Sequence, residues 1–344
     1  ALLPKHRFGI DREVELDFPH LPPGCSIQLD RIARDYVLEN IRENLRNLAV
    51  QIPERIQTFE HDSNLQLTFS NFINHHDYEP EVLLSRETWT GWKAKARLCP
   101  IPNDPDLQHL RQSQALIVSI TGPREVSLMR NVLERLSERD AFGALQIAGN
   151  AAISFHYRIW GDVGNRFDLK TYEDSFGRLV HNPSILSDLR EIVEWLQSKT
   201  TILGEIPQLP FKCSMELHAQ YGIKDIQAQM GKATLETAGL RGVGIIPFPE
   251  VRAYALLITF QKTEKEFSPS TMYADYPISR ELLHWESQSN TPQTSDVGQN
   301  LINHQARGYT ILIFARDQKK RNSFTVPFTY LGPAKLVSYQ SERP

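Results

Sequence analysis

Hydrophobic positions recur at helical spacing through the first two hundred residues of the chain. Between residues 29 and 48, apolar side chains return about every 3.6 positions with charges between them, which predicts one amphipathic helix. Gly122-Pro123 places a proline at the first position of another helix, and Asn182-Pro183 opens a further one in the same way. Residues 26–200 are therefore predicted to be helical almost throughout.

The pattern changes after residues 204–210, which are rich in proline and glycine. A short helix is predicted from about Lys224 to Met230, with Gly231 ending it. Apolar and polar positions then alternate in segments that predict four strands, at residues 252–260, 309–316, 326–331 and 334–339. The polar stretch 261–308 is longer than most connections inside a compact domain, so we expect it to be functional or disordered.

These patterns predict an α+β chain, and its length of 344 residues favours two domains. We expect residues 1–205 to form an all-helical domain and residues 206–344 a small, mostly antiparallel, β-barrel-like domain. The barrels of base-reading domains of the PUA and EVE type offer a fold-level analogy for the second domain.

Composition and charge restrict the environment of the chain. With 40% hydrophobic residues and no apolar run near the roughly 18 residues of a membrane span, we expect a cytoplasmic protein and no membrane partner. Three widely separated cysteines argue against a disulfide framework. The net charge of -3 divides into +3 for residues 208–344 and -6 for residues 1–207. This imbalance favours nucleic-acid binding by the C-terminal part only slightly.

A search for catalytic motifs finds none that is convincing. The nearest string to a phosphate-binding loop, Gly231-Lys232-Ala233-Thr234, lacks the earlier glycine and follows a predicted helix instead of a strand. His75-His76-Asp77 has no second ligand cluster nearby, and a solvated helix end explains it better than a metal site. We therefore expect no catalytic residue, no metal and no cofactor in this chain.

One group of residues has the chemistry of base recognition. Within residues 273–289, aromatic rings for stacking lie among amides, hydroxyls and an arginine. The candidates are Tyr273, Tyr276, Arg280, His284, Trp285, Ser287 and Gln288. The alternative is that Trp285, Tyr273 and Tyr276 are core aromatics, since buried Tyr and Trp also need polar partners. A nuclease that uses His284, Glu286 and His304 is a weaker alternative.

A second candidate group is basic. Lys319, Lys320 and Arg321 are predicted to lie in a turn between two strands, after Arg316. Flexible cations at a hairpin tip provide positive field without directional recognition of bases. We therefore expect Lys319, Lys320 and Arg321 to contact DNA phosphates, and we count Arg316 among the nucleic-acid-binding residues.

The same C-terminal residues resemble a known family. The run 262–279, followed by residues 284–289, Gly298-Gln299, His304, Gly308, residues 312–316 and residues 327–332, is similar to the domain of unknown function 3427. This domain occurs at the C-terminus of bacterial proteins that join a phospholipase-D-type nuclease to a DEAD/DEAH-box helicase. Residues 18–31 resemble the segment after the second helicase motor lobe, so we expect motor and nuclease to precede Ala1.

The resemblance implies a part in DNA restriction or phage defence. ATP and Mg²⁺ would then belong only to the missing helicase motor, not to this chain. Our leading hypothesis is a DNA-binding, target-recognition accessory region whose partners are DNA, including modified DNA, and the helicase and nuclease domains of the same parent protein. The competing hypothesis is a structural or protein-interaction module that braces the helicase.

Overall fold

The computed structural model describes residues 50–240, 244–261, 275–287, 291–321 and 324–340. They belong to two compact units, Ala1–Asn103 and Asp104–Pro344. The predicted amphipathic helix at residues 29–48 lies outside the described residues. None of the described helices has the length and apolar character that a membrane span requires.

The first unit is helical and has an aromatic core. Its helices are residues 50–63, α3 (Phe69–His76), α4 (Pro80–Arg86) and α5 (Trp89–Lys95). The rings of Phe69 and Phe72 pack on Trp89 with centroids 5.6 and 5.4 Å apart. The hydroxyl groups of Thr68 and Thr88 accept backbone hydrogen bonds at the starts of α3 and α5, which satisfies N–H groups that a helix leaves free.

Six helices begin the second unit, as the sequence pattern predicted for this region. They are α6 (Leu107–Ile117), α7 (Pro123–Ser137), α8 (Ala141–Ala148), α9 (Ala152–Trp160), α10 (Tyr172–Leu179) and α11 (Pro183–Lys199). The predicted starts at Pro123 and Pro183 are confirmed, because each proline occupies the first turn of its helix. The change to strands after residue 205 occurs inside this same compact unit.

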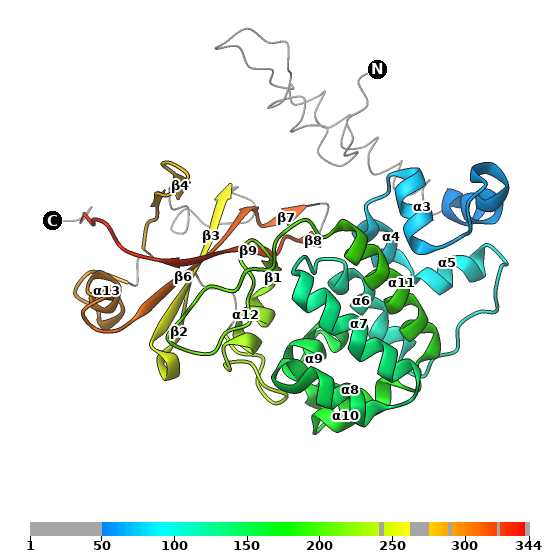
Figure 1. Cartoon of the computed structure of the whole chain (residues 1–344), viewed down its shortest axis with the longest axis horizontal. Coiled ribbons are helices and arrows are strands. Elements are labelled where there is room, and N and C mark those ends of the chain that lie inside the picture. Colours follow the sequence, from blue (N-terminus) through cyan, green and yellow to red (C-terminus); the bar gives the residue numbers. More distant parts are fainter. Residues whose placement is uncertain (1–49, 241–243, 262–274, 288–290, 322–323, 341–344) are drawn as a thin grey trace, which may run out of the picture. The chain divides into compact units, whose positions relative to one another are not determined.

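The β region is an open five-stranded sheet with two small hairpins beside it (Figure 1). The sheet contains β1 (Gln220–Tyr221), β2 (Ile245–Phe248), β3 (Ala253–Gln261), β6 (Thr310–Gln318) and β9 (Phe328–Ala334) in the order β1-β9-β6-β3-β2. The hairpins pair β4 (Tyr276–Pro277) with β5 (Leu283–His284) and β7 (Lys320–Arg321) with β8 (Phe324–Thr325). Two further helices are α12 (Ile223–Gln229) and α13 (Asp296–Ile302).

The expectation of a barrel is corrected by this topology. The described strands form no closed barrel, since β1 and β2 are the two edges of the sheet and do not pair with each other. The neighbouring strands β3 and β6 are parallel, while the other pairs in the sheet are antiparallel. A parallel pair needs a long crossover connection, which explains the long stretch between the two strands.

The strand predictions are correct for the centre of the sheet and wrong at its margins. β3, β6 and β9 lie where strands were expected, and α12 matches the predicted short helix. The fourth predicted strand, 334–339, is wrong, because β9 ends at Ala334 and residues 335–339 have no regular structure. β1 and β2 were missed. β1, with two residues, is too short to produce an alternating pattern, and three of the four residues of β2 are buried, so β2 does not alternate.

Both faces of the sheet are covered by apolar side chains. One face carries Tyr221, Phe248, Leu312 and Phe314 in a cluster with Ile226 of α12. The other carries a second cluster, which contains Tyr254, Leu256, Ile258, Ile311 and Ile313 together with Leu301 of α13. α13 and the β4–β5 hairpin lie on the side of the sheet away from helices α6 to α11 (Figure 1).

The start of α11 depends on a residue distant in sequence. Its N-cap residue, Asn182, makes no side-chain cap, and the buried carboxylate of Asp104 accepts hydrogen bonds from the N–H groups of Ser184 and Ile185. The Ser184 hydroxyl donates to the same carboxylate at 2.8 Å. A negative charge at this position also interacts favourably with the helix dipole.

We expect Asp104→Ala to lower the free energy of unfolding by about 1 to 2 kcal/mol, because α11 would lose its cap. The melting temperature should fall by roughly 2 to 8 °C, measured by circular dichroism. Glu138→Ala is the control, since that exposed side chain should change the free energy by at most about 0.5 kcal/mol. Equal melting temperatures for wild type and Asp104→Ala would show that the cap is unimportant.

Helix α9 is buried along its whole length, and His156 lies inside it. The His156 Nε2 atom donates to the carbonyl oxygen of Asp162 at 2.9 Å, and Nδ1 accepts from the Ser175 hydroxyl at 2.8 Å. Burial lowers the pKa of His156 from 6.5 to about 4. The folded protein therefore holds this imidazole neutral at a pH where the unfolded chain would protonate it.

As the pH falls from about 6.5 to about 4, the unfolded chain takes up a proton at His156 and the folded chain does not, so stability should be lost. The loss due to this residue is on the order of 3 kcal/mol. Urea unfolding at pH 7 and pH 4.5 should show a clearly smaller difference for His156→Gln than for wild type. An identical difference in both proteins would exclude His156 as a source of the acid sensitivity.

Candidate functional site

Several of the predicted base-recognition residues lie on the β4–β5 hairpin. Tyr276 pairs in register with His284, and Pro277 pairs with Leu283. The turn is held by the Ser279 hydroxyl oxygen, which accepts from the N–H groups of Glu281 and Leu282 at 3.1 Å each. Arg280 is exposed at this tip.

Alternation along β5 decides which side chains face the sheet. Leu283 and Trp285 both pack, partly buried, against the second apolar cluster of the sheet. His284 points away from that cluster and stacks on the ring of Tyr276, with centroids 4.7 Å apart and planes 25° apart. Tyr276 is 49% exposed, so this pair presents a flat aromatic surface to solvent.

Polar contacts anchor the hairpin at its base. The buried Asp275 carboxylate accepts a hydrogen bond from the N–H of Glu286 at 3.0 Å. The carboxylate of Glu286 lies 3.7 Å from His284 Nε2, an ion pair when the imidazole is protonated. Ser287 is exposed next to this pair. The predicted residues Tyr273 and Gln288 lie outside the described residues.

The basic residues are arranged differently from the predicted free turn. β6 continues to Gln318, and Lys320 and Arg321 form β7, which pairs with β8. The guanidinium of Arg316 donates to the Thr259 hydroxyl at 3.0 Å and to the Val326 carbonyl at 2.9 Å. It also lies 4.1 Å from the centre of the Phe328 ring. Arg316 therefore holds the strands together, while Lys320 is exposed and Lys319 is half-buried.

Of the three residues considered for a nuclease, His304 has backbone partners on both ring nitrogens. Nδ1 of His304 contacts the carbonyl oxygen of Tyr309 at 3.3 Å, and the N–H of Leu336 donates to Nε2 at 3.2 Å. Both ring nitrogens are thus engaged with backbone groups, and the side chain is buried. This arrangement anchors the C-terminal segment to the end of α13.

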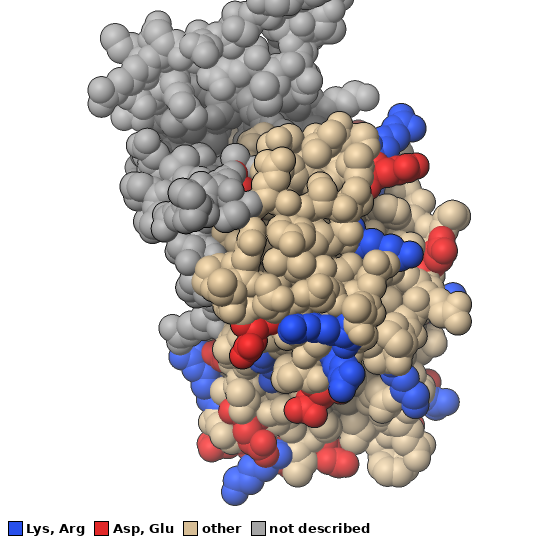
Figure 2. Space-filling view, turned by 90° about the vertical axis from the view of Figure 1, so that its left-hand side faces the viewer, with Lys and Arg blue, Asp and Glu red and all other residues tan. Residues whose placement is uncertain are grey.

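The face that carries α13, the hairpin and the C-terminal segment has little net charge (Figure 2). In its lower part basic and acidic side chains are mixed, and much of the described upper part has neither. The hairpin and the C-terminal segment also expose large apolar side chains, namely Tyr276, Ile278, Leu282, Leu336, Val337 and Tyr339. This view shows no continuous basic patch over the described residues.

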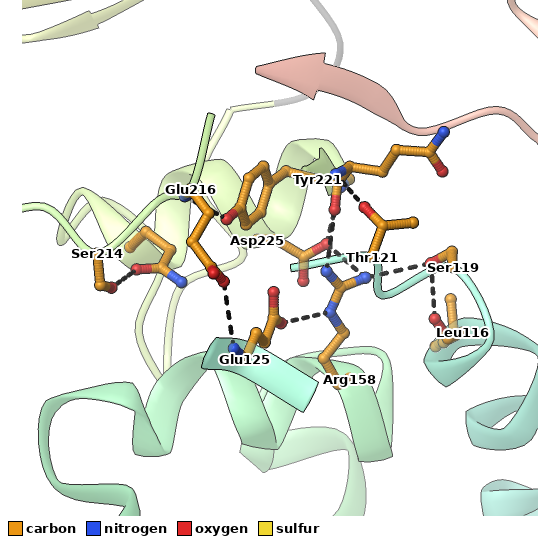
Figure 3. Close-up of polar contacts among 12 residues, drawn as sticks. Leu116, Ser119, Thr121, Glu125, Arg158, Ser214, Glu216, Tyr221 and Asp225 are labelled. Carbon is orange, nitrogen blue, oxygen red and sulfur yellow. Dashed lines mark hydrogen bonds and ion pairs between the residues drawn. The ribbon is translucent and has the colours of Figure 1, made fainter. Parts of the chain in front are cut away.

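A buried polar cluster, which the sequence analysis missed, surrounds Arg158 of α9 (Figure 3). The Arg158 side chain is only 4% exposed. Its Nε atom lies 3.2 Å from Oε1 of Glu125, and Nη1 lies 3.0 Å from Oδ2 of Asp225. The guanidinium also donates to the Ser119 hydroxyl at 3.3 Å and to the Gln220 carbonyl at 3.5 Å. One cation thereby joins α7, α9, α12 and β1.

The ionisation of the cluster follows from burial and charge. Burial alone would lower the pKa of Arg158, but the carboxylates of Asp225 and Glu125 outweigh it and raise the pKa. Burial raises the pKa of Glu125, and Arg158 only partly offsets this effect. The raised pKa favours the protonated form of Glu125.

Glu216 completes the cluster by capping α7 from a distance in sequence. Its carboxylate accepts from the N–H groups of Arg124 at 3.0 Å and Glu125 at 3.2 Å. The N-cap residue of α7, Gly122, has no side chain, and an added Cβ there would lie 2.3 Å from Oε2 of Glu216. The glycine is therefore required for the carboxylate to reach the helix end. In the sequence, the local feature that could have indicated this buried cluster is the arginine within the apolar segment of α9.

Comparison with known families finds a match in the C-terminal part of the chain. Residues 215–344 match the family model of a domain of unknown function (DUF3427). No curated protein matches the chain. The DUF3427 match includes the five-stranded sheet, the β4–β5 hairpin and the basic strand β7. It also includes Glu216 and Asp225 of the buried cluster, whereas Glu125 and Arg158 precede it. The cluster therefore ties the DUF3427 region to the helices before it.

We expect Arg158→Met to lower the free energy of unfolding by about 3 to 5 kcal/mol, because Glu125 and Asp225 would lose the buried cation that pairs with them. Chemical denaturation measures this change. Arg130→Met is the matched control, since Arg130 makes an exposed ion pair with Glu134 on α7 and its loss should cost less than about 1 kcal/mol. Similar losses for the two variants would contradict the proposed importance of the buried cluster.

Proposed function

We propose that this chain is a nucleic-acid-binding accessory region and that the β4–β5 hairpin contacts DNA. The observation that carries the proposal is the exposed, stacked pair of Tyr276 and His284 beside the exposed guanidinium of Arg280. A base can stack on an aromatic surface of this kind, and an arginine at the tip can bind a phosphate or stack on the next base.

The other predicted residues contribute to DNA binding to different extents in this proposal. Lys319 and Lys320 supply phosphate contacts at the start of the β7–β8 hairpin, and we propose the same role for Arg321. Ser287 contributes less than expected, because its hydroxyl donates to the carbonyl oxygen of Thr291 at 3.2 Å. Trp285 supports the hairpin through its packing on the sheet. Arg316 contributes less than expected, because its guanidinium is bound to strand partners.

The wider context of the proposal comes from the family resemblance. The region would act in the cytoplasm, within a helicase–nuclease of DNA restriction or phage defence, and would deliver DNA, including modified DNA, to the motor. ATP and Mg²⁺ would bind the motor, and this chain would perform no catalysis itself. The proposal does not depend on a PUA- or EVE-type barrel, since an open sheet can display a binding hairpin equally well.

A second candidate is the protein-interaction module. The exposed apolar side chains of Ile278 and Leu282 flank the tip of the hairpin, and the face that carries it shows no continuous basic patch over the described residues (Figure 2). Such a surface suits a protein partner, for which the helicase or nuclease domains are the natural choice.

DNA binding by the whole chain can be measured by fluorescence anisotropy, with labelled single- and double-stranded DNA over a series of salt concentrations. Tyr276→Ala should weaken binding roughly ten- to a hundredfold, which corresponds to about 1 to 3 kcal/mol of stacking. Arg280→Ala should reduce the slope of log affinity against log salt by about 1. Tyr339→Ala is the matched control, because it removes a tyrosine that is 58% exposed and lies outside the hairpin.

Two results would count against the DNA proposal. Absence of binding even at low salt would reject nucleic acid as the partner. Binding that is equally strong in Tyr276→Ala and wild type would reject the hairpin as the contact surface. If Ile278→Ala instead weakened association with the isolated helicase or nuclease domains, the protein-interaction module would be favoured.

A further inference from the structure

A cavity of about 130 Å³ lies beside the Arg158 cluster, inside the second compact unit. Helices α7, α8 and α9 form most of its wall, together with residues of the segment before β1. The wall is mainly apolar and includes Leu128, Met129, Val132 and Phe155. At its margin are the exposed residues Arg124 and Ser214, so the cavity reaches the protein surface.

Two buried polar atoms of cavity-lining residues have no hydrogen-bond partner. Oε1 of Glu125 faces Arg158, but Oε2 is buried and unpaired. Ser154 is 5% exposed and its hydroxyl is also unpaired, although a serine in a helix commonly donates to a carbonyl of the preceding turn. Unpaired buried polar atoms are rare in folded proteins, because each has lost its hydration without compensation.

Glu125 is the one acidic residue among those that line the cavity, and the arginine of its wall, Arg124, lies at the exposed margin, where its guanidinium donates to the carbonyl oxygen of Gly204. Three carboxylates, those of Glu125, Glu216 and Asp225, surround the single guanidinium of Arg158 (Figure 3). Glu216 accepts two backbone N–H groups at the start of α7, and Asp225 accepts the N–H of Gly222 at 2.8 Å. Among these carboxylates, Oε2 of Glu125 is buried and has no partner. Burial raises the pKa of Glu125, which favours a proton there when the cavity holds no cation.

We propose that this cavity binds a small organic cation, a primary ammonium group on a short hydrocarbon chain. The ammonium group donates to Oε2 of Glu125 and to the Ser154 hydroxyl, and the chain lies along the apolar wall. A protein cavity of about 150 Å³ accommodates benzene, so the volume here suits roughly five heavy atoms. A metal ion fits less well, because no group of three or more metal-binding side chains occurs among the described residues.

The site is independent of nucleic-acid binding by the hairpin. The hairpin packs against the apolar cluster on one face of the sheet, and Tyr221, which lines the cavity, belongs to the cluster on the other. Failure of either proposal therefore leaves the other intact.

Isothermal titration calorimetry of the whole chain with n-butylammonium chloride, at constant ionic strength, tests the proposal. We expect saturable binding with a Kd in the millimolar range and an increase in melting temperature with ligand concentration. Ser154→Ala and Glu125→Gln should each weaken binding by about tenfold or more. Ser113→Ala is the matched control, because that buried serine donates to the carbonyl of Leu110 on α6.

Neutral 1-butanol separates charge recognition from burial of hydrocarbon. It should bind at least tenfold more weakly than n-butylammonium, since it lacks the charge. Equal binding of the two compounds would overturn the assignment of a cation, and no saturation by n-butylammonium up to about 50 mM would overturn the site. Unchanged affinity in Ser154→Ala would also overturn it, and this variant decides the outcome if Glu125→Gln does not fold.

Discussion

The burial of one guanidinium constrains the second compact unit more than any other interaction described above. Arg158 has lost its hydration, so it requires acceptors at fixed positions, and α7, α12 and the backbone of β1 provide them. Burying such a group contributes little net stability, because the cost of desolvation offsets most of the Coulomb attraction. Its effect is specificity: an alternative packing of α9 would leave a buried charge unpaired.

The same constraint explains the unusual features around it. Because α7 begins at a glycine, Glu216 can approach its first turn and take the place of a local cap. Three carboxylates lie around the one guanidinium of Arg158. One of them, Glu125, lines a cavity with mainly apolar walls. The buried Arg158 therefore accounts both for the specific packing of α9 and for a neighbouring carboxyl group, that of Glu125, with an unpaired oxygen.

The five-stranded sheet separates the Arg158 cluster from the β4–β5 hairpin. β3 and β6 are apolar on both faces, so one face packs toward α12 and the other toward α13 and the hairpin. Trp285 anchors the hairpin to the second face, which leaves Tyr276 and Arg280 exposed to solvent. The guanidinium of Arg316 is bound to groups of neighbouring strands, so few exposed cations remain for a nucleic acid. In the proposed function, base stacking would therefore contribute a large part of the affinity.

The sequence by itself determined the helical region, the starts of α7 and α11, and the central strands β3, β6 and β9. These features depend on local periodicity and on prolines at helix starts, which are visible within a few residues. It also indicated the aromatic and polar residues of the hairpin as candidates. Only the tertiary structure decided that Arg316 binds strand partners, that His304 anchors backbone, that the sheet is open, and that Arg158 meets Glu125 and Asp225. These outcomes depend on contacts between residues that are distant along the chain, so no local sequence pattern could predict them.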